Sequence, residues 1–304
     1  MSAADWLLLV VLSLLWGGSF FFAKVAVGEL PPLTLALGRV AIAATILAAL
    51  AGLRGEQLAP LLQAWPAFAV LGLLNCTLPF SLIFWAQMHI PSGLASILNA
   101  TTPILTVLVA HVATADEKLT AAKLVGVIAG FIGVTVMLGR DAVAADSAGI
   151  WPQLACLAAA LSYAIAGVCG RRLARLPPMT AATGQLIAAT VLVLPFAAVV
   201  DRPWTLALPS PSALGALLSL AAISTALAYV IYFRILAQAG ATNLLLVTFL
   251  IPVSAILLGT ALLGERLARH HLAGMTTIAL GVAAIDGRPL TWALTWAMRR
   301  RRAE

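Results

Sequence analysis

Ten apolar stretches follow one another along the 304-residue chain, each close to the length of a membrane-crossing helix. A helix needs roughly 20 mainly apolar residues to cross the hydrocarbon layer of a bilayer. Pairs such as Pro31-Pro32 and Pro177-Pro178, which disfavour a continuing helix, separate the stretches. The stretches are residues 6–27, 33–53, 66–88, 91–111, 120–138, 151–170, 179–200, 212–234, 240–262 and 270–286. This pattern predicts an all-α polytopic membrane protein with ten transmembrane helices.

The charge balance supports this prediction and suggests a topology. Hydrophobic residues make up 62% of the chain and charged residues 10%, whereas a soluble domain carries about 25% charged residues. The net charge of +7 lies in short loops and the tail, so a nucleic-acid partner is not expected. With a cytoplasmic N-terminus, the inner loops and tail hold twelve basic residues and the outer loops five. The positive-inside rule therefore places both termini in the cytoplasm.

An internal repeat divides the chain into two halves. Glu117-Lys118-Leu119 and the glycines that follow, including Gly133, recur 148 residues later as Glu265-Arg266-Leu267 and Gly281. The repeat predicts a first five-helix unit over residues 1–145, a second over residues 146–288, and a basic cytoplasmic tail over residues 289–304. The lipid bilayer is the expected surroundings of both units.

Five helices per unit is an odd number, so corresponding helices must cross the membrane in opposite directions. The expected architecture is therefore two inverted five-helix repeats, which is the arrangement that supports alternating access in transporters. Matched prolines in corresponding helices mark candidate helix breaks near a substrate site. Here they are Pro103 in the fourth stretch and Pro252 in the ninth.

These motifs resemble the drug/metabolite transporter superfamily, EamA type. The resemblance rests on Trp16 to Phe20 with Lys24, on Gly38-Arg39, and on the repeated Glu-(Lys/Arg)-Leu segments before glycine-rich helices. Within the family, the chain is most similar to YddG-type exporters of aromatic and neutral amino acids. The resemblance implies a multi-pass protein of the bacterial inner (plasma) membrane. It also implies a cavity formed by the first, third, fourth, sixth, eighth and ninth helices.

Polar and aromatic side chains at bilayer depth are candidates for the cavity lining, because they are costly in lipid. Helix packing is the alternative role, since hydroxyl groups often bond their own backbone and amides can join neighbouring helices. The candidate substrate-binding residues are Trp16, Asn75, Phe80, Asn99, Tyr163, Gln185, Tyr229, Tyr232 and Phe249.

Two basic residues lie in or beside the first two helices. Arg39 lies about six residues into the second stretch, so its side chain could reach the outer interface by snorkelling. The alternative is that Arg39 or Lys24 attracts a substrate carboxylate.

The residue types missing from the helix centres narrow the function. None of the eleven acidic residues lies near a helix centre, and the four histidines lie at helix ends. We therefore expect no catalytic residue, no metal and no cofactor. The expected activity is transport of small metabolites by alternating access, with export of aromatic or neutral amino acids. We expect no obligatory proton coupling through a membrane carboxylate. Export of amphipathic drugs and a membrane-embedded lipid-processing enzyme remain the alternatives. The oligomeric state stays open, and a monomer would suffice.

Overall fold

A computed structural model describes residues 3–56, 63–113, 119–141, 149–170, 176–232, 234–235 and 247–286. These residues are helical or form the connections between helices, and no strand occurs among them. The predicted tail at residues 289–304 and most of the loop after residue 141 lie outside the described ranges.

The described residues of the first half contain eight helical elements. They are α1 (Ala3–Ala26), α2 (Pro32–Leu53), α4 (Trp65–Gly72), the π-helical turn η1 (Leu73–Thr77), α5 (Leu78–Gln87), α6 (Ser92–Asn99), α7 (Thr102–Ala113) and α8 (Ala121–Asp141). The elements α4, η1 and α5 run on without a gap and form one long rod over Trp65–Gln87. Prolines at the start of α2 and α4 occupy positions where a helix needs no backbone N–H donor. Pro79, in contrast, lies within the continuous rod, just after the π-helical turn η1.

The second half also contains eight described elements. They are α9 (Trp151–Gly170), α10 (Pro178–Phe196), the π-helical turn η3 (Ala197–Asp201), the short 3-10 turn η4 (Pro203–Thr205), α11 (Pro211–Ala221), the π-helical turn η5 (Ala222–Leu227), α13 (Val247–Leu263) and α14 (Arg269–Asp286). The N-cap of α11 is Ser210, whose Oγ accepts the backbone N–H of Ala213 at 3.2 Å.

Seven helical rods within the described residues are long and apolar enough to cross a membrane. They correspond to the predicted first to fourth and sixth to eighth spans. The other three predicted spans coincide with α8, α13 and α14, where the shorter apolar stretches are Lys123–Gly133 and Leu250–Leu263. Large apolar side chains point outward, for example Val191 and Leu280, each 65% exposed. Such a surface suits lipid contact, and the chain is therefore a multi-pass membrane protein.

The two predicted helix breaks differ from each other. The fourth span is interrupted, because α6 ends at Asn99 and α7 begins at Thr102, directly before Pro103. The ninth span is not: α13 continues through Pro252, so the predicted break is absent there. Membrane helices tolerate an internal proline where neighbouring groups compensate for the missing backbone hydrogen bond.

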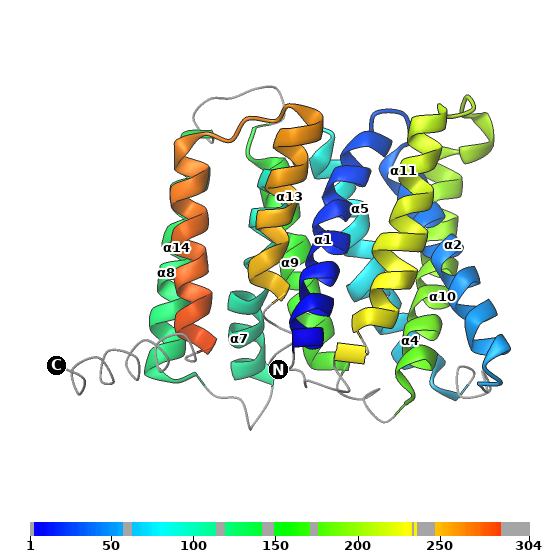
Figure 1. Ribbon diagram of the computed structural model, residues 1–304, viewed down its shortest axis with the longest axis horizontal. Coiled ribbons are helices and arrows are strands. Elements are labelled where there is room, and N and C mark those ends of the chain that lie inside the picture. Colours follow the sequence, from blue (N-terminus) through cyan, green and yellow to red (C-terminus); the bar gives the residue numbers. More distant parts are fainter. Residues whose placement is uncertain are drawn as a thin grey trace.

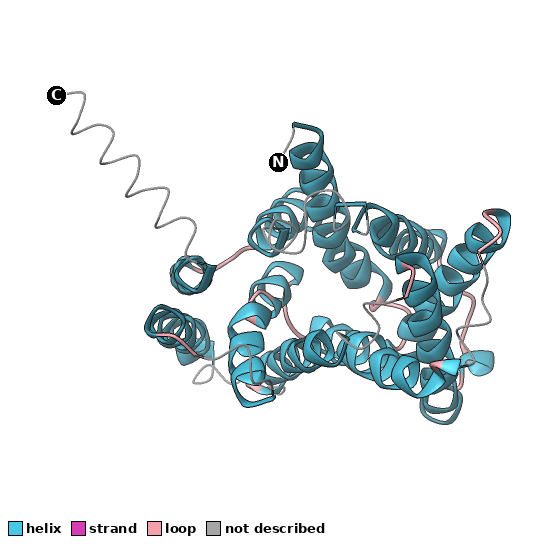
Figure 2. Ribbon diagram, turned by 90° about the horizontal axis from the view of Figure 1, so that it is seen from below, coloured by secondary structure: helices cyan, strands magenta, loops and turns pink. Residues whose placement is uncertain are grey.

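The helices form a bundle with one outlying pair. The helices α1 and α13 pack together near the middle, and α2 packs against α10 and α11 toward one end (Figure 1). At the opposite end, α8 and α14 lie side by side as a pair in both views (Figures 1 and 2). Glycines allow their close approach, since a Cβ added at Gly281 would lie 2.6 Å from the carbonyl oxygen of Gly126.

The bundle has two end faces, a near face and a far face. The near face is the one at which α1 begins, at the bottom of Figure 1. The far face is the one at which α1 ends and α2 and α11 begin, at the top of Figure 1.

Candidate functional site

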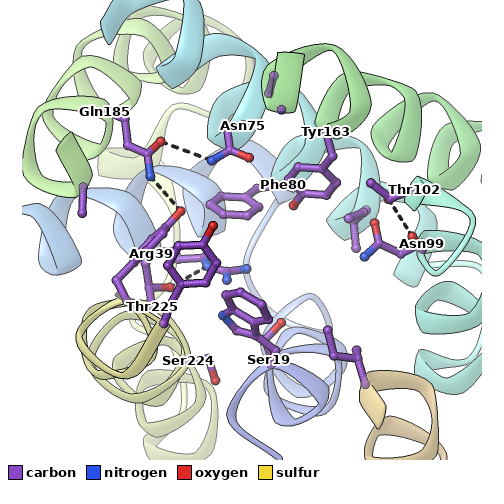
Figure 3. A pocket seen from close by; sticks show the side chains of 18 of the residues that line it. Ser19, Arg39, Asn75, Phe80, Asn99, Thr102, Tyr163, Gln185, Ser224 and Thr225 are labelled. Carbon is purple, nitrogen blue, oxygen red and sulfur yellow. Dashed lines mark hydrogen bonds between the residues drawn. The ribbon is translucent and has the colours of Figure 1, made fainter. Parts of the chain in front are cut away.

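A cavity of about 560 Å³ lies inside the helix bundle. Its wall includes eight of the nine predicted substrate-binding residues, from α1, η1, α5, α6, α9, α10 and the eighth span (Figure 3). These eight are Trp16, Asn75, Phe80, Asn99, Tyr163, Gln185, Tyr229 and Tyr232. The ninth, Phe249, has a side chain outside what the structure describes. The size and the mixture of aromatic and polar groups are typical of a small-molecule site.

Two π-helical turns contribute to this wall, one in each half of the chain. The turn η1 carries Asn75 and η5 carries Thr225, and their spacing in the sequence is almost that of the 148-residue repeat. A π-helical turn displaces backbone hydrogen bonds, and such turns are frequent at functional sites. Hydroxyl groups bond to carbonyls at both turns: Ser162 donates to Leu74 O at 2.7 Å, and Thr225 to Leu220 O at 2.8 Å.

The side chain of Arg39 points into the cavity, so the snorkelling role predicted for it is wrong. The residue is only 6% exposed, and its Nε donates to Thr225 Oγ1 at 2.9 Å (Figure 3). Its Cζ atom lies 3.9 Å from the centre of the Phe80 ring, in a cation–π contact. The residues packed around α2 decide this direction, which helical periodicity alone does not fix.

Asn75, Gln185 and Tyr229 form a hydrogen-bonded chain along one wall. Asn75 Nδ2 donates to Gln185 Oε1 at 3.2 Å, and Gln185 Nε2 donates to the Tyr229 hydroxyl at 2.8 Å (Figure 3). The chain joins the third, seventh and eighth spans. Because each amide is oriented by its neighbour, this wall presents a fixed polar surface to a bound solute.

Aromatic rings form another part of the wall. Trp16 and Tyr232 have ring centres 5.8 Å apart, and Tyr232 meets Tyr229 edge-on at 6.3 Å. These distances are typical of favourable aromatic pairs. The rings thus form an apolar surface suited to an aromatic or aliphatic group of a solute.

Lys24 lies outside the cavity wall, unlike Arg39. Its ammonium group donates to the carbonyl oxygens of Gln87 and Ile90, at 2.6 and 3.0 Å. These bonds tie the end of α1 to the connection between α5 and α6. The role that this geometry gives Lys24 is structural, and the predicted attraction of a substrate carboxylate has no support at this position.

Three carboxylates on the far face bind the N-terminal ends of helices. Glu29 accepts the backbone N–H and the hydroxyl of Ser210, at 2.7 and 2.5 Å, where α11 begins. Asp201 Oδ2 accepts the backbone N–H and the hydroxyl of Thr34 in the first turn of α2, at 2.6 and 3.0 Å. Each pair stabilises a helix end through its unpaired N–H groups and its dipole.

Glu265 makes the third such contact, at the start of α6. Its carboxylate accepts the backbone N–H and the hydroxyl of Ser92, both at 2.8 Å, and the backbone N–H of Gly93 at 3.2 Å. All three contacts join the first half of the chain to the second. These three contacts, the carboxylate latches, hold the halves together on the far face.

Several wall residues were missed by the sequence analysis. Gln87 lies near the end of its span and was not predicted to line the cavity; its Nε2 donates to Phe20 O at 2.7 Å. Ser224 lines the cavity with a buried hydroxyl that has no partner. It adjoins Thr225 within η5, and the helical spacing that predicts an inward face for Thr225, Tyr229 and Tyr232 does not include Ser224.

The family of this chain follows from a comparison with known proteins. The model of the EamA-like transporter family matches residues 5–139 and again residues 150–285. The chain belongs to the EamA-like transporter family. The two matches cover most of the chain, one in each half.

Relatives match most of the length of this chain, and two of the three described below are named as transporters. The uncharacterized inner membrane transporter YedA of Escherichia coli K12 is 30% identical over 281 residues, which are 91% of this chain and 89% of YedA. The uncharacterized transporter YoaV of Bacillus subtilis is 24% identical, over 90% of this chain and 94% of YoaV. Protein PecM of Dickeya dadantii is 27% identical, over 86% of each chain. This EamA-like protein is thus a membrane transporter.

A solved crystal structure has the same fold. It superposes with a TM-score of 0.67 over 94% of this chain and 98% of the other, at 22% sequence identity. At that identity the likeness concerns the fold alone.

Proposed function

We propose that this EamA-like transporter moves small carboxylate-bearing metabolites, including aromatic and neutral amino acids, across the bacterial inner membrane by alternating access. The observation that carries the proposal is the cavity inside the membrane bundle, where aromatic rings, amides and a buried guanidinium converge from seven spans. Such a wall offers one surface to an apolar group and another to a polar one. We place the protein in the inner membrane because its relative YedA is named an inner membrane transporter.

Alternating access is supported by where the two halves are held together. The carboxylate latches join the halves on the far face, above the cavity. The wall extends in the other direction to Gly170 and Leu176, at the near-face ends of α9 and α10. This arrangement fits a state that is closed at the far face. Two inverted five-helix repeats, with both termini in the cytoplasm, would allow the opposite state by the same motion. In that state the far face would be open and the near face closed.

The proposed transport proceeds down the solute gradient and needs no proton coupling through a membrane carboxylate. The carboxylates of Glu29, Asp201 and Glu265 lie at the far face in the latches, outside the cavity wall. Flux in proteoliposomes, with and without a pH gradient at fixed membrane potential, tests this. Concentrative uptake that requires the pH gradient would overturn it.

Alanine substitutions in the aromatic wall test the site itself. Trp16→Ala and Tyr229→Ala should each reduce flux of labelled phenylalanine about tenfold or more, since a lost aromatic contact costs about 1 kcal/mol beyond its buried area. Trp204, which is 71% exposed and lies in η4, provides the matched control, and Trp204→Ala should transport at the parent rate. Parent-like flux in both wall variants would mean that the cavity is not the transport site.

A further inference from the structure

The cavity wall carries one charged side chain among its described residues, and that side chain is cationic. Arg39 is this residue, and the remaining polar groups of the wall are hydroxyls and amides. Its guanidinium has one hydrogen bond, to Thr225, and a ring contact with Phe80. A guanidinium has five N–H donors, so most of its bonding capacity is left for another group.

No carboxylate described in the structure neutralises Arg39. Glu29, Asp201 and Glu265 are held in the latches, and Glu56 lies at the other end of the bundle, after α2. None of these four lines the cavity. A buried cation without a counter-ion is costly in a low-dielectric interior, so an anion that enters the cavity gains a strong interaction.

The wall stabilises a positively charged group less than it stabilises an anion. An ammonium group loses its hydration on entry, and the described wall offers it neutral acceptors only, among them the unpaired oxygens of Gln87 and Asn99. A carboxylate, in contrast, fits the fork of a guanidinium with two parallel hydrogen bonds. The field inside the cavity therefore favours anions over zwitterions and disfavours cations.

We infer that Arg39 recognises the cargo by its carboxylate, and that the preferred cargo is a small organic monocarboxylate for which an α-ammonium group is not required. The inference rests on the proposed transport function and narrows its substrate class. Thr225 is a positioning residue in this scheme, because its hydroxyl accepts from Arg39 Nε while donating to Leu220 O in the π-helical turn. The rings of Trp16 and Tyr232 would then contact the apolar body of the anion.

Three compounds with one aromatic body and different charges test the inference. They are 3-phenylpropionate, phenylalanine and 2-phenylethylamine, titrated by calorimetry into the full chain in nanodiscs at pH 7. We expect 3-phenylpropionate to bind at least as tightly as phenylalanine, and 2-phenylethylamine to bind about 10- to 100-fold more weakly, as expected for the loss of a hydrogen-bonded charge pair. Arg39→Gln should remove this preference, and Thr225→Val should reduce it by misorienting the guanidinium.

The controls separate charge recognition from folding. Lys24→Gln removes a cation that lies outside the wall, and should leave the order of the three affinities unchanged. If Arg39→Gln does not yield a monodisperse protein, Arg39→Lys keeps the charge without the fork and should give an intermediate preference.

The outcomes of these titrations are distinct. Equal binding of the amine and the carboxylates, or a preference that survives in the Arg39 variants, would overturn the inference. Phenylalanine binding more than tenfold tighter than 3-phenylpropionate would also overturn it, because the ammonium would then be needed. Charge-selective binding without any flux in liposomes would support the inference and overturn the proposed transport. Flux without charge preference would support the proposed transport and overturn the inference.

Discussion

Neutralising Glu265 should open the far face of the transporter. The carboxylate of Glu265 accepts three hydrogen bonds, from the backbone and hydroxyl of Ser92 and from the backbone of Gly93, at the start of α6. In Glu265→Gln, one side of the carboxylate becomes an NH2 group that faces these N–H donors. The variant therefore loses at least one charge-assisted bond and the favourable interaction with the helix dipole.

The magnitude follows from these contacts. A hydrogen bond to a charged group contributes about 1.5–3 kcal/mol, and a charge at a helix end about 0.3–1 kcal/mol. Because Glu265 is partly exposed, a value near the lower end applies. We expect the latched state to lose about 2–3 kcal/mol, which raises the ratio of open to closed protein about 30- to 150-fold.

A buried cysteine provides the assay. Ala95 is 0% exposed and lies one helical turn below Ser92, so a cysteine at this position reacts with maleimide only when the far face opens. The native Cys76, Cys156 and Cys169 are replaced by alanine in this background. The labelling rate of Ala95→Cys should rise with the open fraction, about 30- to 150-fold in Glu265→Gln.

The matched control is Glu56→Gln, which removes a carboxylate at the near face that belongs to none of the latches. Its labelling rate should equal that of the parent. A rate for Glu265→Gln within about twofold of the parent would refute the role of the latch, since 2 kcal/mol corresponds to about 30-fold.

Two further predictions concern acid sensitivity and helix packing. The hydrogen bonds from the hydroxyl and backbone of Ser210 lower the pKa of Glu29 below its ordinary value of 4.5, so its contribution to stability is complete above pH 4.5 and is lost as the pH falls through the lowered pKa. The melting temperature of Glu29→Gln should thus lie below that of the parent at neutral pH and meet it in acid; a gap that persists at the lowest pH would contradict this. Gly281→Ala places a Cβ 2.6 Å from Gly126 O in the α8–α14 pair and should destabilise the protein by about 1–3 kcal/mol in thermal melts. Gly215 has open space around it, so Gly215→Ala should not destabilise the protein. Equal melting temperatures of the two variants would mean that the α8–α14 pair separates at little cost.

Much of this architecture was predictable from local features of the sequence. Runs of apolar residues specify membrane helices because an unpaired backbone polar group is too costly in lipid, whichever neighbours the helix has. The same cost explains why eight polar or aromatic candidates such as Asn75, Gln185 and Tyr229 line one cavity. Their shared location could be predicted without knowledge of how the helices pack, since lipid excludes them from most other positions.

The tertiary structure decided which of these groups meet, and how they are oriented. Arg39 points inward because Thr225 and Phe80, each far from it in the sequence, accept its guanidinium; hydropathy alone favoured the opposite direction. Lys24 is occupied by the carbonyls of Gln87 and Ile90, which carry no signal in the residue types. The carboxylate latches join residues 167 to 181 positions apart. Helical period and hydropathy are properties of one segment, whereas the rotation of a helix and the partners at its ends depend on the other segments packed against it.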